Sequence, residues 1–282
     1  MTKTWMITGS SRGFGRRLAE AVLEAGDNLV ATARGTGSLK DLAETYGGRF
    51  RAVTLDVTDP GAAKAAVETV AREFGRLDVL VNNAGYANVD SIEDADPQDF
   101  RAQVETNLWG VINVTRAALP VLHAQRSGHI IQFSSVGGRL GTPGLGAYQL
   151  SKWGIEGFSE VLAQEVAPFG VKVTIIEPGA FRTDWAGSSM KASQHLHPDY
   201  QPTVGATIEG LRDSSGKQQG DPARAAKIII DIAGSDKPPL RLLLGKSALR
   251  QAREITAHRS AEDEKWATVT ESADFDDVAS NQ

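Results

Sequence analysis

The chain has no cysteine, which excludes disulfide bonds, thiolate metal sites and a cysteine nucleophile. Its five histidines are scattered, and the His195-x-His197 pair is too small a ligand set for zinc, so we expect no bound metal. No segment approaches the roughly 20 apolar residues of a membrane-spanning helix, and the first glycine comes too early for the apolar region of a signal peptide. We therefore expect a cytoplasmic protein that does not bind a membrane.

The chain also has no excess of positive charge. The 282 residues carry a formal net charge of −5, so the chain as a whole offers no basic surface that would release counterions from a nucleic acid. We expect a small-molecule ligand and no nucleic-acid partner. Hydrophobic residues make up 41% of the sequence, which is enough to bury one sizeable core. Nothing in the composition divides the chain, so residues 1–282 are predicted to form a single domain.

Short apolar runs rich in β-branched residues alternate with helical patterns. The expected strands are Thr4–Thr8, Leu29–Ala33, Phe50–Leu55, Val79–Val81, His129–Ser134, Val171–Ile176 and Leu240–Leu244. One helix should begin near Phe14 and end at Gly26, and another should begin at Asp96-Pro97, where Asp96 can act as the N-cap. The alternation is typical of an α/β fold, with a Rossmann-like, doubly wound parallel sheet of about seven strands flanked by helices. Ligands bind such sheets outside the carboxyl ends of the strands.

A glycine-rich loop, Thr8–Gly15, follows the first expected strand and opens the first helix. Glycines there allow a tight turn and a close approach of the backbone to a ligand. The start of the helix offers free N–H groups and a partial positive charge to a pyrophosphate. The position of the loop between a strand and a helix therefore predicts a dinucleotide-binding site.

The spacing Gly9-x-x-x-Gly13-x-Gly15 resembles that of the short-chain dehydrogenase/reductase family rather than the more usual G-x-G-x-x-G. Further segments match the family pattern in the same order, between residue 4 and about residue 184: Asp56-Val57, Asn82-Asn83-Ala84-Gly85, Asn107, Ser135, Tyr148-x-x-x-Lys152, Pro178-Gly179 and Thr183. The resemblance implies a cofactor-binding and catalytic core at 1–184, a substrate lid at 185–221 and a C-terminal extension at 245–282.

The resemblance also implies where the cofactor lies. Asp56-Val57 would contact the adenine, and the segment Asn82–Gly85 would line the adenosine ribose. Lys152 would bind the nicotinamide ribose, Pro178-Gly179 would abut the nicotinamide, and Thr183 would bond its carboxamide. The full set of expected cofactor contacts is Gly9, Ser11, Arg12, Gly13, Phe14, Gly15, Arg34, Asp56, Val57, Asn83, Ala84, Gly85, Tyr148, Lys152, Pro178, Gly179 and Thr183.

The charge beside the loop indicates which dinucleotide is bound. A carboxylate at the end of the second strand would accept bonds from a ribose 2′-hydroxyl, whereas an arginine would pair with a 2′-phosphate. That end reads Thr32-Ala33-Arg34, with no acid, and Arg12 inside the glycine loop could reach the same phosphate. The two arginines could instead be ordinary solvated side chains. Together with the missing acid, they favour NADP(H).

Tyr148 and Lys152 are four residues apart on an expected helix, so their side chains share one face. An ammonium about 4 Å from the phenol at an effective dielectric constant of about 20 favours the phenolate by about 4 kcal/mol before desolvation is counted. We therefore expect Lys152 to lower the pKa of Tyr148 by about three units. Tyr148 would then donate a proton in reduction and accept one in oxidation.

Two further residues complete the catalytic set that the family resemblance implies. Ser135 would hydrogen-bond the substrate oxygen; its rival Ser134 should point to the other face of the strand. Asn107 would hold a water molecule that links Lys152 to solvent. The expected catalytic residues are Asn107, Ser135, Tyr148 and Lys152, and the substrate is a ketone or aldehyde or the corresponding alcohol.

The stretch between Thr183 and Asp221 is too long for a simple connection, and the family places a substrate lid there. Its apolar residues could line a pocket for a lipophilic or aryl carbonyl, or they could merely pack the lid on the body. These residues are Trp185, Met190, Leu196, Tyr200, Val204, Ile208 and Leu211. Tyr86, Gly138, Leu140 and Leu145 are further candidates for the pocket wall.

Three other functions are compatible with the same scaffold. Sugar-nucleotide epimerases carry a larger carboxyl-terminal domain than this chain can hold, and enoyl reductases space their tyrosine and lysine differently. A catalytically silent NADP(H) sensor would be expected to lose the Tyr148/Lys152 pair, which is present here. The family resemblance further implies a homodimer or homotetramer.

Overall fold

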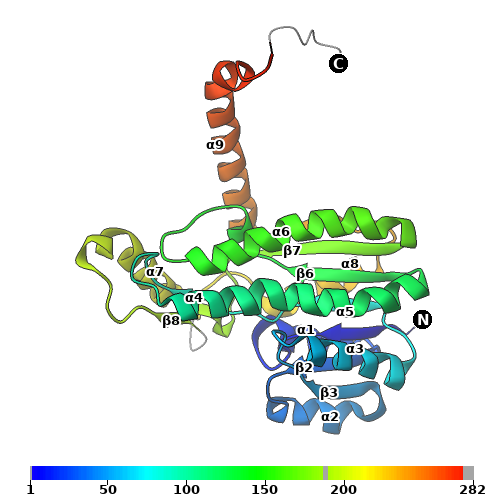
Figure 1. Ribbon diagram of the computed structural model, residues 1–282. Helices are drawn as coiled ribbons and strands as arrows, with labels where there is room; N and C mark the ends of the chain where they lie inside the picture. The colour runs from blue at the N-terminus through cyan, green and yellow to red at the C-terminus, as the bar shows by residue number, and fades with distance from the viewer. Residues whose placement is uncertain (1, 187–189, 276–282) are drawn as a thin grey trace.

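The computed structural model describes residues 2–186 and 190–275 (Figure 1). Its main sheet has seven parallel strands in the order β3-β2-β1-β4-β6-β7-β9. Their bounds are β1 Thr4–Ile7, β2 Asn28–Ala33, β3 Phe50–Thr54, β4 Val79–Asn82, β6 Gly128–Phe133, β7 Val171–Pro178 and β9 Arg241–Leu244. Each of the seven strands expected from the sequence is present, which confirms the doubly wound α/β fold.

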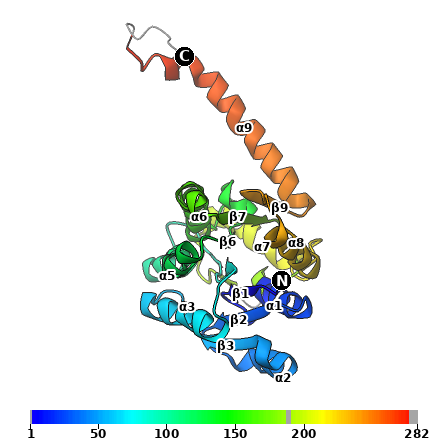
Figure 2. The same ribbon diagram turned by 90° about the vertical axis from the view of Figure 1, so that its right-hand side faces the viewer.

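Helices cover both faces of this sheet (Figure 2). Helices α1 (Gly13–Glu24), α2 (Lys40–Tyr46) and α8 (Pro222–Gly234) contribute to one buried apolar cluster, and α3 (Pro60–Phe74), α5 (Gly110–Gln125) and α6 (Gly146–Val166) contribute to the other. Strand β1 shows why there are two clusters. Trp5 and Ile7 belong to the first and Met6 to the second, because successive side chains of a strand point to opposite faces.

Short-range signals set the ends of several helices. Asp96 accepts a hydrogen bond from the Gln98 N–H at 2.8 Å and caps α4 (Pro97–Val104), as the sequence predicts. Helix α1 ends at Glu24 with Ala25 as its C-cap, and the next residue, Gly26, has a φ of 90°, which lies in the region that favours glycine. These two helix ends therefore follow from the residues at the boundary and need no tertiary contact.

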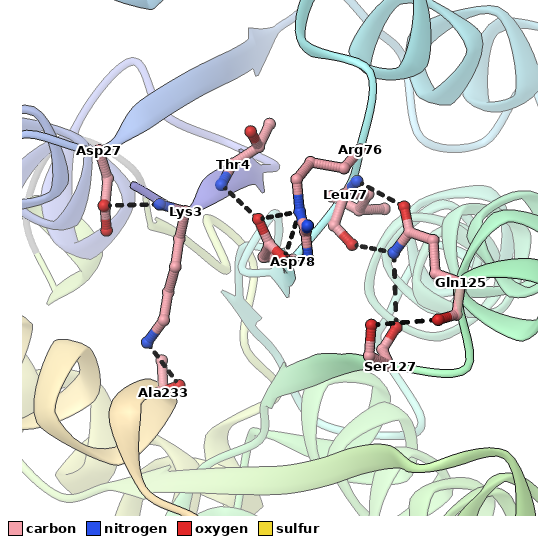
Figure 3. Close-up of polar contacts among 9 residues, drawn as sticks. All are labelled: Lys3, Thr4, Asp27, Arg76, Leu77, Asp78, Gln125, Ser127 and Ala233. Atoms are coloured by element: carbon pink, nitrogen blue, oxygen red, sulfur yellow. Dashed lines mark hydrogen bonds and ion pairs between the residues drawn. The ribbon is translucent and has the colours of Figure 1, made fainter. Parts of the chain in front are cut away.

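The amino-terminal ends of the strands are held by polar contacts (Figure 3). The Lys3 N–H donates to Asp27 Oδ1 at 2.9 Å, and the Thr4 N–H donates to Asp78 Oδ2 at 2.8 Å. The Gln125 amide bonds both the N–H and the carbonyl of Leu77. These contacts hold the amino-terminal ends of the strands together, at the end of the sheet opposite the glycine loop. This end of the sheet therefore contributes to the stability of the fold.

The direction of winding reverses next to β1, which pairs with β2 on one side and β4 on the other. The loops that leave β1 and β4 therefore separate at the carboxyl edge and open a crevice between them. Smaller elements lie above this edge. A two-stranded sheet of β5 (Asn88–Val89) and β8 (Lys191–Ala192), which the sequence did not predict, and helix α7 (Ala206–Ser214) belong to the expected lid region and its support.

The C-terminal helix α9 (Lys246–Glu271) leaves the sheet after β9 and stands clear of the domain (Figures 1 and 2). The division of the domain into core, lid and extension stays a prediction, and residues 187–189 of the lid and 276–282 of the extension lie outside the described residues. Within the described ranges, no helix is both long and apolar enough to cross a membrane.

Candidate active site

The glycine loop turns sharply between β1 and α1. Gly9 and Gly13 have φ values of 68° and 58°, which residues with side chains rarely adopt. A Cβ on Gly15 would collide with the carbonyl oxygen of Gly9, so the first turn of α1 can approach the loop only without a side chain at Gly15. The loop therefore needs glycine at the three positions that the sequence singled out.

Hydrogen bonds with the loop that follows β4 brace the glycine loop. The Thr8 hydroxyl accepts hydrogen bonds from the backbone N–H groups of Asn83 at 3.0 Å and Ala84 at 3.1 Å. The Asn83 amide donates to the carbonyls of Thr8 at 2.9 Å and Gly9 at 3.1 Å. These four bonds hold the loops after β1 and β4 in one relative position, which sets the width of the crevice.

A cavity of about 790 Å³ opens at this edge of the sheet. Two of the residues predicted for the site do not line it: Gly15, which is buried under the loop, and Asn107. The predicted residues that do line it are Gly9, Ser11, Arg12, Gly13, Phe14, Arg34, Asp56, Val57, Asn83, Ala84, Gly85, Ser135, Tyr148, Lys152, Pro178, Gly179 and Thr183. Segments up to about 170 residues apart in the sequence thus meet around one cavity, although their contacts with a ligand stay predictions.

Arg12 and Arg34 lie at the rim of the cavity with exposed side chains. Within the described residues neither forms an ion pair, whereas the nearby Arg16 is bound to Asp41 and Glu20. Hydrogen bonds from the N–H and hydroxyl of Thr58 hold the pKa of Asp56 below its ordinary value, and the charge of Arg34 adds to this effect. The rim therefore carries two cations that are available to an anionic ligand.

Tyr148 and Lys152 lie one turn apart on α6, with exposed fractions of 8% and 5%. The Lys152 Nζ lies 5.5 Å from the centre of the Tyr148 ring and donates a hydrogen bond of 2.6 Å to the Phe133 carbonyl. The expected fall in the pKa of Tyr148 is wrong, because the net shift is upward. Burial raises the pKa of Tyr148 to about 12, and the neighbouring Ser135 hydroxyl, which stabilises the phenolate, opposes the shift only in part.

Burial acts on Lys152 in the opposite direction. It lowers the pKa of Lys152 to about 8, while the carboxylate of Glu156, one turn further along α6, favours the charged form. Near neutral pH the lysine still carries its charge and the phenol its proton. The pair therefore presents a proton donor next to a cation at the wall of the cavity.

The two candidate serines differ in their surroundings. Ser135 lies within reach of the Tyr148 phenol, and its hydroxyl accepts a hydrogen bond from the Gly137 N–H at 3.0 Å. Ser134 also lines the cavity, but its hydroxyl lies beside Glu156 and donates to the Lys152 carbonyl at 3.5 Å. This arrangement favours Ser135 as the serine that reaches a substrate oxygen.

Asn107 is fully buried in a wide helical turn, Glu105–Trp109, between α4 and α5. Its amide pairs with the backbone of Tyr86, accepting from the N–H at 2.9 Å and donating to the carbonyl at 2.7 Å. These two bonds compensate for an asparagine in a helix interior. Turns of this kind frequently occur at functional sites. The role of Asn107 in holding a water molecule stays a prediction.

All seven apolar lid residues belong to one buried cluster or pack against it, and two of them also line the cavity. Val204 and Ile208 pack in a buried cluster with Leu145 and Tyr148, which supports the interpretation that they hold the lid on the body. Trp185 and Leu211 line the cavity, together with Leu140, Leu145 and Tyr86 from the core. The Trp185 ring lies 5.3 Å from that of Tyr148, at 57° to it. Gly138, also predicted for the pocket wall, lies against Ser134 and Glu156 instead.

Two buried glutamates, each paired with a partly exposed arginine, were missed by the sequence analysis. Arg139 binds both carboxylate oxygens of Glu177, at 2.5 and 2.7 Å, and Arg241 binds Glu156 at 2.8 Å. Glu177 is fully buried and directly precedes Pro178. No motif connects these four residues, since they come from separate segments. The only signal in the sequence was that Glu156 lies within an expected helix and Glu177 directly follows an apolar strand.

The short chain dehydrogenase family model matches residues 3–194, which is more than half of the chain. The chain belongs to the short-chain dehydrogenase family. It is an oxidoreductase of this family, as the fold and the arrangement of Tyr148 and Lys152 led us to expect.

Three relatives show how far the likeness extends. Oxidoreductase BOA17 of Botryotinia fuckeliana is 53% identical over 271 residues, covering 96% of this chain and 98% of the relative. A short-chain dehydrogenase structure from Streptomyces avermitilis is 41% identical with a TM-score of 0.91, covering 98% of this chain and all of that one. An alcohol dehydrogenase from the archaeon Thermococcus sibiricus, solved with 5-hydroxy-NADP, is 25% identical with a TM-score of 0.70, covering 86% and 96%.

Proposed function

We propose that this short-chain dehydrogenase is an NADP(H)-dependent enzyme that reduces a ketone or aldehyde to an alcohol, or runs the reverse reaction. Tyr148 would be its general acid or base. The observation that carries the proposal is a buried phenol at the wall of the large cavity, next to a buried lysine. A pKa of about 12 keeps this phenol protonated at neutral pH, which suits the donation of a proton to a carbonyl oxygen.

The residues around the crevice fit a dinucleotide, because the glycine loop lines the cavity and α1 begins there with free backbone N–H groups. Bound there, a nicotinamide supplies hydride in reduction and accepts it in oxidation. Tyr148 donates its proton to the substrate oxygen as negative charge develops on it. The Ser135 hydroxyl orients that oxygen, and the Lys152 charge stabilises the phenolate that remains.

The preference for NADP(H) over NAD(H) is supported by charge. Arg12 and Arg34 flank the end of the crevice where an adenosine 2′-phosphate would lie, and no acid follows β2. A guanidinium binds phosphate through paired, charge-assisted hydrogen bonds. The NADP analogue bound by the Thermococcus sibiricus relative is compatible with this choice.

The substrate side of the cavity supports a lipophilic or aryl carbonyl. Trp185, Leu140, Leu145 and Leu211 surround the approach to Tyr148, and a flat apolar substrate could stack on the Trp185 ring. We therefore infer an apolar ketone or aldehyde.

The test is the consumption of NADPH and NADH with aryl, steroid, retinoid and aliphatic carbonyls. Tyr148→Phe is run beside the unmodified protein, and Tyr46→Phe serves as a matched control because Tyr46 lies on α2, away from the cavity. We expect turnover that prefers NADPH, is lost in Tyr148→Phe and is kept in Tyr46→Phe. Binding of NADPH without turnover of any carbonyl would favour the silent sensor instead.

A further inference from the structure

One buried side chain at the wall of the large cavity has an unpaired polar atom. Gln218 is 8% exposed and lines the cavity, and its carboxamide oxygen is buried without a hydrogen-bond partner among the described residues. The other unpaired buried atoms in the described part of the chain belong to Asn82, His129, Glu156 and Ser159, and none of these residues lines this cavity. An unpaired buried polar atom costs stability, so its presence at a ligand cavity calls for a function.

The backbone around Gln218 is fixed by the segment that follows β7. The Gly220 N–H donates to the Ala180 carbonyl at 3.1 Å, and the Arg182 N–H donates to the Gly220 carbonyl at 2.9 Å. The Arg182 guanidinium donates to the Gln218 carbonyl at 3.1 Å. A Cβ on Gly220 would lie 2.5 Å from the Phe181 ring, so the two segments need glycine for this close approach. Backbone contacts thus hold Gln218 at the cavity wall, without help from its carboxamide oxygen.

Helix α7 connects Gln218 with the wall that carries Tyr148. Leu211 and Ser214 of α7 line the cavity, and Gln218 follows four residues after Ser214. Leu211 also packs against the buried cluster that contains Tyr148. The Ser214 hydroxyl donates to the Leu211 carbonyl at 3.0 Å, so its hydrogen is used within the helix. A ligand whose carbonyl lies at Tyr148 and that extends along α7 would therefore reach the Gln218 carboxamide.

The chemistry of a carboxamide limits which group it can bind there. It has no charge, so it cannot neutralise an ion that leaves water for the cavity. It has a donor end and an acceptor end, and a half-turn about its last bond exchanges the two. A hydroxyl group both donates and accepts, so it can pair with either end. The ligand group that suits Gln218 is therefore a neutral hydroxyl.

We propose that Gln218 is a specificity-determining residue that hydrogen-bonds a hydroxyl group at the end of the substrate remote from the reacting carbonyl. The inference rests on the proposed function, because that function places the carbonyl at Tyr148. It narrows the substrate to a ketone or aldehyde that is apolar where it passes Trp185 and Leu211 and hydroxylated beyond them. The carboxamide oxygen is left without a partner by the fold because the substrate supplies one.

Two neighbouring glutamines provide matched variants. Gln218→Met keeps the length of the side chain and removes both polar ends. Gln219→Met is the control, because Gln219 is exposed and does not line the cavity. In urea unfolding we expect Gln218→Met to be at least as stable as the unmodified chain, since it removes an unpaired buried polar atom. A loss of stability in Gln218→Met that Gln219→Met does not share would assign the carboxamide to the fold and overturn the proposal.

Selectivity is measured with pairs of ketones that differ by one hydroxyl remote from the carbonyl. The pairs are phenyl ketones with and without a para-hydroxyl group, and steroid ketones with and without a hydroxyl on the ring farthest from the carbonyl. In at least one pair, the unmodified chain and Gln219→Met should favour the hydroxylated member in kcat/KM by about tenfold or more. Gln218→Met should lose this preference and keep its affinity for NADPH.

Three results would overturn the proposal. The unmodified chain could show no preference within any pair, or the preference could survive in Gln218→Met. Alternatively, Gln218→Met could lose affinity for NADPH in a fluorescence titration as strongly as it loses the preference, which would make Gln218 a cofactor ligand.

A binding measurement separates this inference from the proposed function. The same pairs are titrated by calorimetry into the NADPH complex of Tyr148→Phe, where no reduction is expected, and into that of the double variant Tyr148→Phe with Gln218→Met. If the unmodified chain reduces no ketone, the proposed function fails, and the binding ratio still decides on Gln218. A preference of about tenfold for the hydroxylated member that the double variant loses would support the role of Gln218. Equal binding of both members to Tyr148→Phe would overturn it.

Discussion

His129 should make the stability of the fold depend on pH. It lies on β6 with an exposed fraction of 3%, and its Nε2 lies 2.9 Å from the Thr174 hydroxyl. That hydroxyl donates its own hydrogen to the Pro239 carbonyl at 2.8 Å, so His129 donates from Nε2. The Nδ1 atom is buried and has no hydrogen-bond partner among the described residues. The imidazole is therefore held neutral.

The size of the effect follows from the shift in pKa. Burial, with smaller contributions from the charges of Lys172 and Lys3, lowers the pKa of His129 from 6.5 to about 4. The unfolded chain takes up the proton first as the pH falls, so acid favours unfolding. The stabilisation is fully present above pH 6.5 and is lost as the pH falls to about 4. A difference of about 2.5 units corresponds to about 3 kcal/mol.

The assay is urea unfolding at a fixed protein concentration from pH 4 to 7.5, with His129→Gln as the matched variant. Glutamine can still donate to Thr174 but does not titrate in this range. Carboxylates that also destabilise the fold in acid are common to both chains and cancel in the difference. We expect the free energy of unfolding of the unmodified chain, relative to that of His129→Gln, to fall by about 3 kcal/mol between pH 7.5 and pH 4. Parallel pH profiles would refute the reasoning.

Two further predictions concern the cofactor. Arg34→Ala should raise the KM for NADPH roughly 10- to 100-fold, since one charge-assisted hydrogen bond contributes about 1.5–3 kcal/mol. The KM for NADH should stay nearly unchanged. An equal rise in both KM values in steady-state kinetics would contradict this prediction. Gly15→Ala should weaken NADPH binding at least tenfold in a fluorescence titration, because the new Cβ collides with Gly9. Gly157→Ala, where a Cβ meets nothing within 4 Å, should bind NADPH normally, and equal binding by both variants would contradict the steric argument.

The main sheet could be predicted because each of its strands is a short apolar run bounded by helical patterns. The central strands β1, β4 and β7 are buried on both faces, so their residues alone reveal them, whereas the edge strands β3 and β9 are only partly buried. The β5–β8 sheet could not be found in this way. Its strands have two residues each, Asn88–Val89 and Lys191–Ala192, and they pair only because the fold brings these distant segments together.

The candidate site shows the same division. Its members could be named from motifs, and the structure gathers most of them around one cavity. The pKa of Tyr148 could not be predicted, because a sequence gives the charge of Lys152 but not the burial of the phenol. Burial outweighs the other influences and reverses the expected sign. Spacing along a helix therefore predicts proximity but leaves the local environment undetermined.

The buried charges below the site explain how distant segments can keep one geometry. Arg139 follows the loop that carries Ser135, and Glu177 precedes the loop of Pro178 and Gly179, so their ion pair joins two walls of the cavity. Replacing a whole buried pair by apolar residues is often harmless, whereas removing one partner leaves an uncompensated charge. A purely stabilising role would therefore be met equally well by apolar packing. The fixed geometry of two parallel hydrogen bonds, at 2.5 and 2.7 Å, instead sets the relative position of the two loops.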